Sequence, residues 1–371
     1  MTNQPRSRKR PTRRQFLQAA ALTLPWLTLS GCGWRLANVR PAAGSQDDAN
    51  LLYIYTWAGY TDQDLLDRFE EETGIRAIAD VYDSNEAMLA RLQAGGGGAY
   101  SIIYPSEYMV QKMITMGMLL ELDQPRIEGM YRLFPRFQQA DYDPGNRHSV
   151  PVSWGTTGLV YNTQQVQPPP ADWDYLWVYQ QQLARRMTLV NDVREVMGAA
   201  LKKLGYSYNS TNVEHIQAAY QALMDLKPAI ASFTSDAWRP QILSGDLKIA
   251  MCYSSDATEI MPENEDLRYV LPESGSSLWI DTLAIPKTAP NVEGAYAWIN
   301  FMLQPDVAAR IVERLSFATP NKAAYNLLPP DLKNDTSLFP PEEALERCEN
   351  LEPLGDVEAV YDRYWTKLTS A

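Results

Sequence analysis

From residue 51 onward, short apolar strands alternate with amphipathic helices, and this alternation restricts the fold more than any other feature of the sequence. Apolar and β-branched residues predict strands at 51–55 (LLYIY), 76–81 and 102–105. The first two are followed by apolar residues at helical spacing, behind the capping residues Thr61 and Ser84. Strands that alternate with helices in this way predict an α/β fold with parallel strands.

Two longer extended runs divide the rest of the chain, residues 151–161 (PVSWGTTGLVY) and residues 275–286 (GSSLWIDTLAIP). Strands and helices alternate again between them, so we interpret the two runs as crossings between two lobes. A chain of 371 residues is long enough to bury two cores. The predicted lobes are 51–155 with about 282–325, and 156–281 with about 326–371.

Residues 1–31 are predicted to be an export signal. A basic start leads into TRRQFL, which resembles a twin-arginine signal, and the apolar run that follows is shorter than the roughly 20 residues that span a bilayer. The run ends in LSGC, which resembles a lipobox and would make Cys32 the lipidated first residue of the mature protein. The alternative is a soluble export signal with an unrelated cysteine. We expect residues 32–50 to be a flexible tether that holds an extracytoplasmic protein at the membrane.

The balance of charge argues against a nucleic-acid partner. The chain has 45 acidic and 33 basic residues, and six of the basic ones lie in the first fourteen positions. The remainder is strongly acidic, whereas phosphate binding needs a basic surface. The two histidines and the three cysteines (Cys32, Cys252 and Cys348) lack the spacing of a zinc site. We expect no metal and no cofactor, and a disulfide between Cys252 and Cys348 stays open.

The second crossing contains a pattern that suits an organic cation. Trp279 and Asp281 are two residues apart, so a strand places both on one face. An indole ring beside a carboxylate is a good receptor for an ammonium group. The same residues could also be a half-buried tryptophan beside a turn aspartate, and this stretch alone does not decide between the two.

Other polar and aromatic residues follow the predicted strands of the first lobe. Trp57 and Tyr60 come after the first strand, and Ser106 and Tyr108 come after the third. Parallel sheets receive ligands at the carboxyl ends of their strands. These four residues are therefore candidates for a binding site.

Several motifs together resemble one known family, the bacterial spermidine/putrescine-binding proteins of ATP-driven import systems. The resemblance runs from about residue 51 to residue 368. Its most specific pieces are TWAGY (56–60), YDSNEAMLARL (82–92), YPSEYMV (104–110), NDVREV (191–196), LWIDTLAIP (278–286) and ATPNKAA (318–324). The family implies a two-lobed periplasmic-binding-protein fold, type II-like, that closes on its ligand.

The resemblance also implies which residues contact a polyamine. The family's ligand-binding positions correspond to Trp57, Tyr60, Ser106, Tyr108, Asp192, Glu195, Trp279 and Asp281. Tyr253 and Phe317 stand where the family has a tryptophan and a tyrosine. Ala58 replaces a threonine, and a late glutamine has no clear counterpart between residues 346 and 353, so the preferred polyamine is open.

The chemistry of these residues fits a chain of methylenes punctuated by ammonium groups. Asp192, Glu195 and Asp281 would pair with the ammonium groups, and the aromatic rings would line the methylenes. The spacing of Asp192 and Glu195 also fits a capping box at the start of a helix, which is a purely structural role.

The sequence thus predicts a monomeric binding protein, not an enzyme, that delivers spermidine or putrescine to the permease of an ABC importer. A binding protein for a quaternary amine is the first alternative, and its ligand would not depend on Asp281. A secreted hydrolase that uses Asp192 and Glu195 as an acid–base pair is the second alternative, and it would turn over a substrate.

Overall fold

The computed structural model describes residues 50–95 and 98–370. The predicted export signal, the predicted lipidation site at Cys32 and the tether up to residue 49 lie outside these residues. Within the described part of the chain, none of the helices combines the length and the apolar character needed to cross a membrane.

In the part of the chain that the structure describes, nine strands form two sheets that share one strand. They are β1 (Leu51–Trp57), β2 (Arg76–Tyr82), β3 (Ile102–Ile103), β4 (Ser149–Asn162), β5 (Met187–Leu189), β6 (Ile230–Phe233), β7 (Ile249–Tyr253), β8 (Leu267–Val270) and β9 (Leu278–Ala284). β1 pairs parallel with β2 and β3, and β5 pairs parallel with β6 and β7. The predicted α/β class with parallel strands is confirmed.

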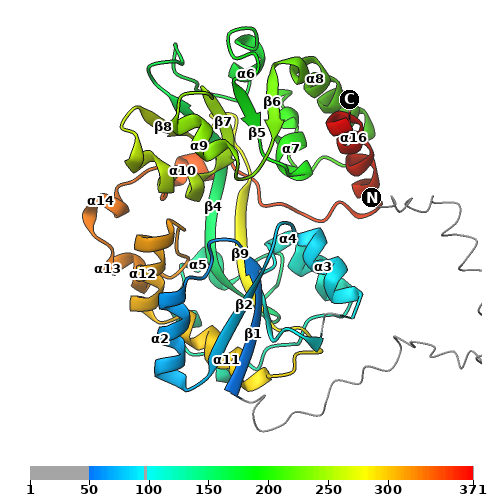
Figure 1. Ribbon diagram of the computed structural model, residues 1–371. Helices are drawn as coiled ribbons and strands as arrows, with labels where there is room; N and C mark the ends of the chain where they lie inside the picture. Colours follow the sequence, from blue (N-terminus) through cyan, green and yellow to red (C-terminus); the bar gives the residue numbers. More distant parts are fainter. Residues whose placement is uncertain (1–49, 96–97, 371) are drawn as a thin grey trace, which may run out of the picture. The chain divides into compact units, whose positions relative to one another are not determined.

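The two predicted crossings are the strands β4 and β9, which run side by side through the middle of Figure 1. They pair antiparallel through Thr156, with an irregularity between Pro151 and Ser153. From Thr157 on, β4 pairs with β7 and β8 instead. One continuous strand therefore belongs to both sheets, and β9 carries Trp279 and Asp281 at the point where the sheets meet.

Helices cover both sheets (Figure 1). Around the first sheet lie α2 (Gln63–Thr73), α3 (Asn85–Gln93), α4 (Glu107–Thr115), α5 (Pro135–Gln138), α11 (Val292–Met302), α12 (Pro305–Leu315), α13 (Lys322–Leu327), α14 (Pro330–Lys333) and α15 (Glu342–Leu345). Around the second lie α6 (Tyr175–Val178), α7 (Val193–Lys203), α8 (Val213–Leu226), α9 (Trp238–Leu243), α10 (Ser254–Ile260) and α16 (Glu358–Ser370).

The hydrophobic core is divided in the same way as the sheets. A first cluster collects buried residues from 52–154 and from 278–351, together with Tyr208, and a second collects residues from 159–270 and from 354–368. A smaller third cluster around Trp238 and Cys252 packs beneath the second sheet. Each sheet thus has its own core.

The chain returns to the second core later than we expected. Leu328, Leu338, Leu345 and Leu351 pack in the first cluster, although the predicted boundary near residue 325 assigned them to the second lobe. Only the segment from Leu354 onward packs in the second cluster. The sequence does not reveal this return, because residues 326–353 form loops and very short helices that show no clear hydrophobic periodicity.

One further expectation changes, and one question that the sequence left open is answered. Asp62, not Thr61, caps α2, because its carboxylate oxygen accepts the backbone N–H of Leu65 at 2.8 Å. Cys252 and Cys348 are both free thiols, so the disulfide that the sequence left open is absent.

Candidate ligand-binding site

One part of the site is built around the carboxylate of Asp281. The side chain is 6% exposed and accepts a hydrogen bond from Ser106 Oγ at 2.6 Å and a second from the Tyr60 hydroxyl. Ser153 Oγ in turn donates to the Tyr60 hydroxyl at 2.9 Å. The Tyr60 ring packs on Phe317, with ring centroids 4.1 Å apart.

Trp57 completes this arrangement. Its indole N–H donates to the backbone carbonyl of Tyr104 at 2.9 Å and lies close enough to Asp281 to favour the ionised carboxylate. Its ring leans on Tyr82, with centroids 4.5 Å apart. We call Trp57, Tyr60, Ser106, Asp281 and Phe317 the Asp281 group.

The Asp281 carboxylate lacks a cationic neighbour. Burial raises its pKa to about 6, although hydrogen bonds from Ser106, Tyr60 and Trp57 act in the opposite direction. Among residues 50–95 and 98–370, no lysine or arginine forms an ion pair with it. A buried carboxylate of this kind costs free energy unless a positive charge joins it.

A second set of side chains surrounds the start of α7. The Asp192 carboxylate accepts the backbone N–H of Arg194 at 2.8 Å and that of Glu195 at 3.1 Å, and so caps the helix. Glu195 does not reach back to complete a capping box; it accepts a hydrogen bond from Ser277 Oγ at 2.8 Å. The structural alternative from the sequence is thus right for Asp192 and wrong for Glu195.

These two carboxylates also resist ionisation. Burial raises the pKa of Glu195, and the neighbouring charge of Asp192 raises it further. Burial likewise raises the pKa of Asp192, while backbone N–H groups and a hydrogen bond from the Tyr253 hydroxyl act in the opposite direction. We call Asp192, Glu195, Tyr253 and Trp279 the Asp192 group.

Trp279 is held against Tyr253 and the backbone of β4. The two rings meet edge to face with centroids 6.0 Å apart. A Cβ atom added to Gly155 would lie 2.2 Å from Trp279 Cζ2, so the ring needs a glycine at that position. The buried indole N–H of Trp279 has no hydrogen-bond partner.

Tyr108 connects the first core to α7. Its hydroxyl accepts from Asn85 Nδ2 at 3.1 Å and donates to Glu86 Oε1 at 3.0 Å. The guanidinium of Arg194 lies 5.7 Å from the centre of its ring. Partial desolvation raises the pKa of Glu86, whose side chain is still exposed to solvent in part, and the charge of Asp192 raises it further. The structure therefore brings all ten sequence-predicted residues together in two neighbouring groups joined by Tyr108 and β9.

Known proteins resemble the chain over most of its length. Residues 64–340 match the family described as bacterial extracellular solute-binding proteins. The chain belongs to this family. Among its relatives, the spermidine/putrescine-binding periplasmic protein of Salmonella typhimurium is 38% identical over 328 residues, which cover 88% of this chain and 94% of that protein. The protein of the same description from Haemophilus influenzae is 34% identical over 346 residues, covering 93% of this chain and 96% of its own.

Solved structures of this family agree with the fold. A putative spermidine/putrescine ABC transporter protein from Listeria monocytogenes superposes with a TM-score of 0.82 at 37% identity, covering 86% of this chain and 98% of that one. A lipoprotein of Treponema pallidum gives a TM-score of 0.78 at 30% identity, covering 86% of this chain and all of that one. The periplasmic-binding-protein fold that the resemblance implied is confirmed.

Sequence reasoning missed several side chains of this solute-binding protein that contact the predicted residues or the backbone between them. They are Asn85, Glu86, Glu107, Ser153, Arg194 and Ser277. Two of them lie next to a predicted residue in the sequence: Glu107 lies between Ser106 and Tyr108, and Arg194 precedes Glu195. That adjacency was the available signal, but nothing in the sequence shows which neighbour points inward.

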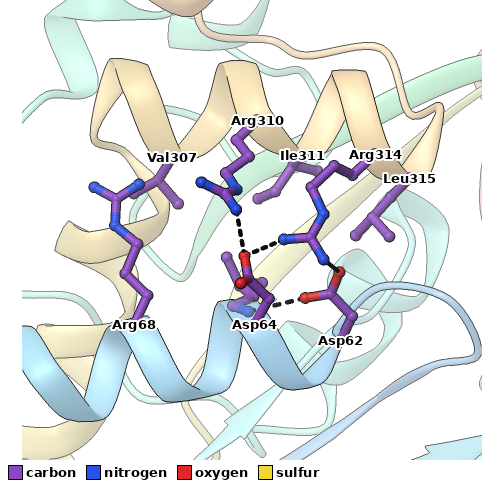
Figure 2. Close-up of a pocket in the computed structure, with 9 residues that line it drawn as sticks. Asp62, Asp64, Arg68, Val307, Arg310, Ile311, Arg314 and Leu315 are labelled. Carbon is purple, nitrogen blue, oxygen red and sulfur yellow. Dashed lines mark hydrogen bonds and ion pairs between the residues drawn. The ribbon is translucent and has the colours of Figure 1, made fainter.

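A hollow between α2 and α12 is not a second ligand site of this solute-binding protein. Arginines from α12 meet the carboxylates of α2 there, as Figure 2 shows for Arg310 and Arg314 with Asp64 and for Arg314 with Asp62. The remaining space holds no more than about one water molecule. These partly exposed ion pairs fasten α12 to α2.

Proposed function

We propose that this protein binds polyamines outside the cytoplasm and delivers them to an ABC importer. The ligand would be spermidine, putrescine or both, and the two lobes would close around it. The proposal is supported by the names of its relatives, which include spermidine/putrescine-binding and putrescine-binding proteins.

A single observation carries the proposal. Two buried carboxylates, Glu195 and Asp281, and the half-buried carboxylate of Asp192 form no ion pair with a lysine or arginine among the residues that the structure describes, although the charge of Arg194 acts on Asp192 and Glu195. The pKa values of Asp192, Glu195 and Asp281 are all raised, chiefly by burial. Arg194 is the nearby cation, and its guanidinium donates to Asn209 and to the carbonyl of Glu352 instead. A multiply charged amine would supply the missing positive charges, because each ammonium group favours the ionised form of a carboxylate beside it.

The roles of the residues follow from their places in the two groups. Asp281 would hold one ammonium group, with Ser106 and Tyr60 fixing its carboxylate. Asp192 and Glu195 would hold another ammonium group. The aromatic rings of the site would line the methylenes between the ammonium groups. They are Trp57, Tyr60, Tyr108, Tyr253, Trp279 and Phe317. A desolvated cation–π contact adds up to about 2 kcal/mol, less than a buried carboxylate–ammonium pair is worth when one partner is removed.

The proposal also includes the export route, the lipid anchor, the oligomeric state and the partners of the protein. The protein would be exported by the twin-arginine route, lipidated at Cys32 and monomeric, without a cofactor. Its partners would be the membrane-embedded permease subunits of the importer. Transport, not catalysis, would be its role.

Calorimetric titration of the purified protein with putrescine, spermidine, choline and glutamate tests the proposal. We expect binding of at least one polyamine and no binding of choline or glutamate. Binding of choline alone would favour a quaternary-amine receptor. Turnover of a substrate, or binding of none of the four compounds, would refute the proposed function.

A further inference from the structure

Glu107 in the first turn of α4 is a buried carboxylate that the binding scheme above does not use. The side chain is fully buried, yet its oxygens accept hydrogen bonds from two separate segments. Oε2 accepts the backbone N–H of Ile280 at 2.9 Å, and Oε1 accepts that of Leu351 at 3.1 Å. Among the residues that the structure describes, no lysine or arginine forms an ion pair with it.

The first of these bonds acts on the central strand of the candidate site. Ile280 lies between Trp279 and Asp281 on β9, so fixing its peptide group fixes the position of both neighbours. Glu107 itself lies between Ser106 and Tyr108. The Glu107 side chain thus sets the distance between the pair Ser106 and Tyr108 on one side and the pair Trp279 and Asp281 on the other.

The second bond acts on residues 349–352, which we call the C-terminal strap. The backbone N–H of Leu278 donates to the carbonyl of Glu349 at 2.9 Å, which attaches the strap to β9. At its other end, Arg194 Nη1 donates to the carbonyl of Glu352 at 2.8 Å. The strap therefore connects α4, β9 and α7, and Glu107 is its attachment to α4.

We propose that Glu107 is a positioning residue of the binding site, whose carboxylate holds β9 and the C-terminal strap in the geometry that receives the ligand. This inference rests on the proposed function for its effect on affinity, but the two hydrogen bonds do not depend on the identity of the ligand. Each oxygen has a separate backbone donor, so a side chain with one acceptor cannot replace it.

The ionisation of Glu107 provides a readout that a remote structural residue would not give. Burial raises its pKa to about 8, the charge of Asp281 raises it as well, and the bonds from Ile280 and Leu351 act in the opposite direction. The other ionisable group that faces it is Tyr142, whose buried hydroxyl has no hydrogen-bond partner. A cation bound at Asp281 would favour the ionised form of Glu107, so binding at pH 7 should release protons.

Glu107→Gln tests this role, with Asp143→Asn as a matched control. Asp143 is also buried and accepts the backbone N–H groups of His148 and Ser149, but it contacts none of the predicted ligand residues. Polyamine affinity and proton release are measured by calorimetry at pH 7 in phosphate and in Tris. We expect Glu107→Gln to weaken binding at least tenfold and to release fewer protons, and Asp143→Asn to change the affinity less than twofold.

Hydrogen exchange without any ligand separates this inference from the proposed function. Glu107→Gln should speed exchange at β9 and at the strap, whereas Asp143→Asn should not. Unchanged exchange at both segments would overturn the inference, and so would equal loss of affinity in the two variants. If Glu107→Gln does not fold, Glu107→Asp keeps the charge but is one methylene shorter, and the same faster exchange at β9 or the strap is expected. Failure of the unmodified protein to bind a polyamine would count against the proposed function alone.

Discussion

Replacing Asp281 by asparagine is the sharpest test of the binding scheme. The substitution keeps the size of the side chain but only one of its two acceptor oxygens. Ser106 Oγ donates to Oδ1 and the Tyr60 hydroxyl donates to Oδ2, so one hydroxyl would face the new N–H₂ group and accept a hydrogen bond from it. It removes the negative charge that is proposed to pair with an ammonium group. The variant therefore changes the electrostatics of the site with little change in packing.

The structure sets the expected size of the effect. Removing one partner of a buried, hydrogen-bonded charge pair costs about 2–5 kcal/mol of binding free energy, which corresponds to a roughly thirty- to several-thousandfold weaker affinity. The effect on the free protein has the opposite sign. Because burial raises the pKa of Asp281 from 3.8 to about 6, its ionisation destabilises the unliganded fold by about 3 kcal/mol at neutral pH, and this penalty grows between about pH 4 and 6.

We therefore expect Asp281→Asn to bind spermidine and putrescine at least tenfold more weakly, with an unliganded melting temperature that is not lowered. Titration calorimetry measures the affinity, and differential scanning calorimetry measures the melting temperature. Glu121→Gln, which changes an exposed carboxylate paired with Arg147, is the control. An affinity within threefold of the unmodified protein would remove Asp281 from the ligand contacts, and a large loss of thermal stability would show that its role is structural.

Two further predictions follow from the same geometry. Polyamine affinity should rise between pH 5 and 8, because Asp281 and Glu195 lose protons in this range while alkylammonium groups stay charged. Calorimetry at several pH values measures the affinity, and an affinity that does not change with pH would contradict this prediction. Gly155→Ala should lower both the polyamine affinity and the melting temperature, since the new Cβ would collide with Trp279 at a cost of about 1–3 kcal/mol of stability. Gly98→Ala is the control, because a Cβ added there meets nothing within 4 Å. Equal effects of the two substitutions would refute the packing argument.

The sequence was sufficient for the strands of the first sheet and for the two long crossings, but the short strands β6 and β8 were not predicted. Apolar runs such as residues 51–55 bury most of a strand, here with Tyr53 exposed, and this pattern does not depend on distant contacts. The extended crossings were predictable for the same reason. The return of residues 328–351 to the first core was not predictable, because irregular segments pack according to surfaces that the rest of the fold creates.

The candidate site was predictable only in part. Trp279 and Asp281 follow from strand periodicity, and the other predicted contacts came largely from resemblance. Glu107 was missed because a glutamate behind a serine at the start of a helix is usually explained by the helix dipole. Its two hydrogen bonds join residues 173 and 244 positions away in the chain, and no local pattern reports a contact of that range.

The C-terminal strap also affects the order in which a newly made chain can become competent to bind. All ten predicted ligand-contacting residues are synthesised by residue 317. The strap and α16 come last, and Tyr361 and Leu368 of α16 fill the second core. A chain interrupted after residue 340 would carry every predicted contact but would lack the backbone donor at Leu351 and the closing helix of the second lobe. We therefore expect a chain that ends before the strap and α16 to bind its ligand less well than the full chain.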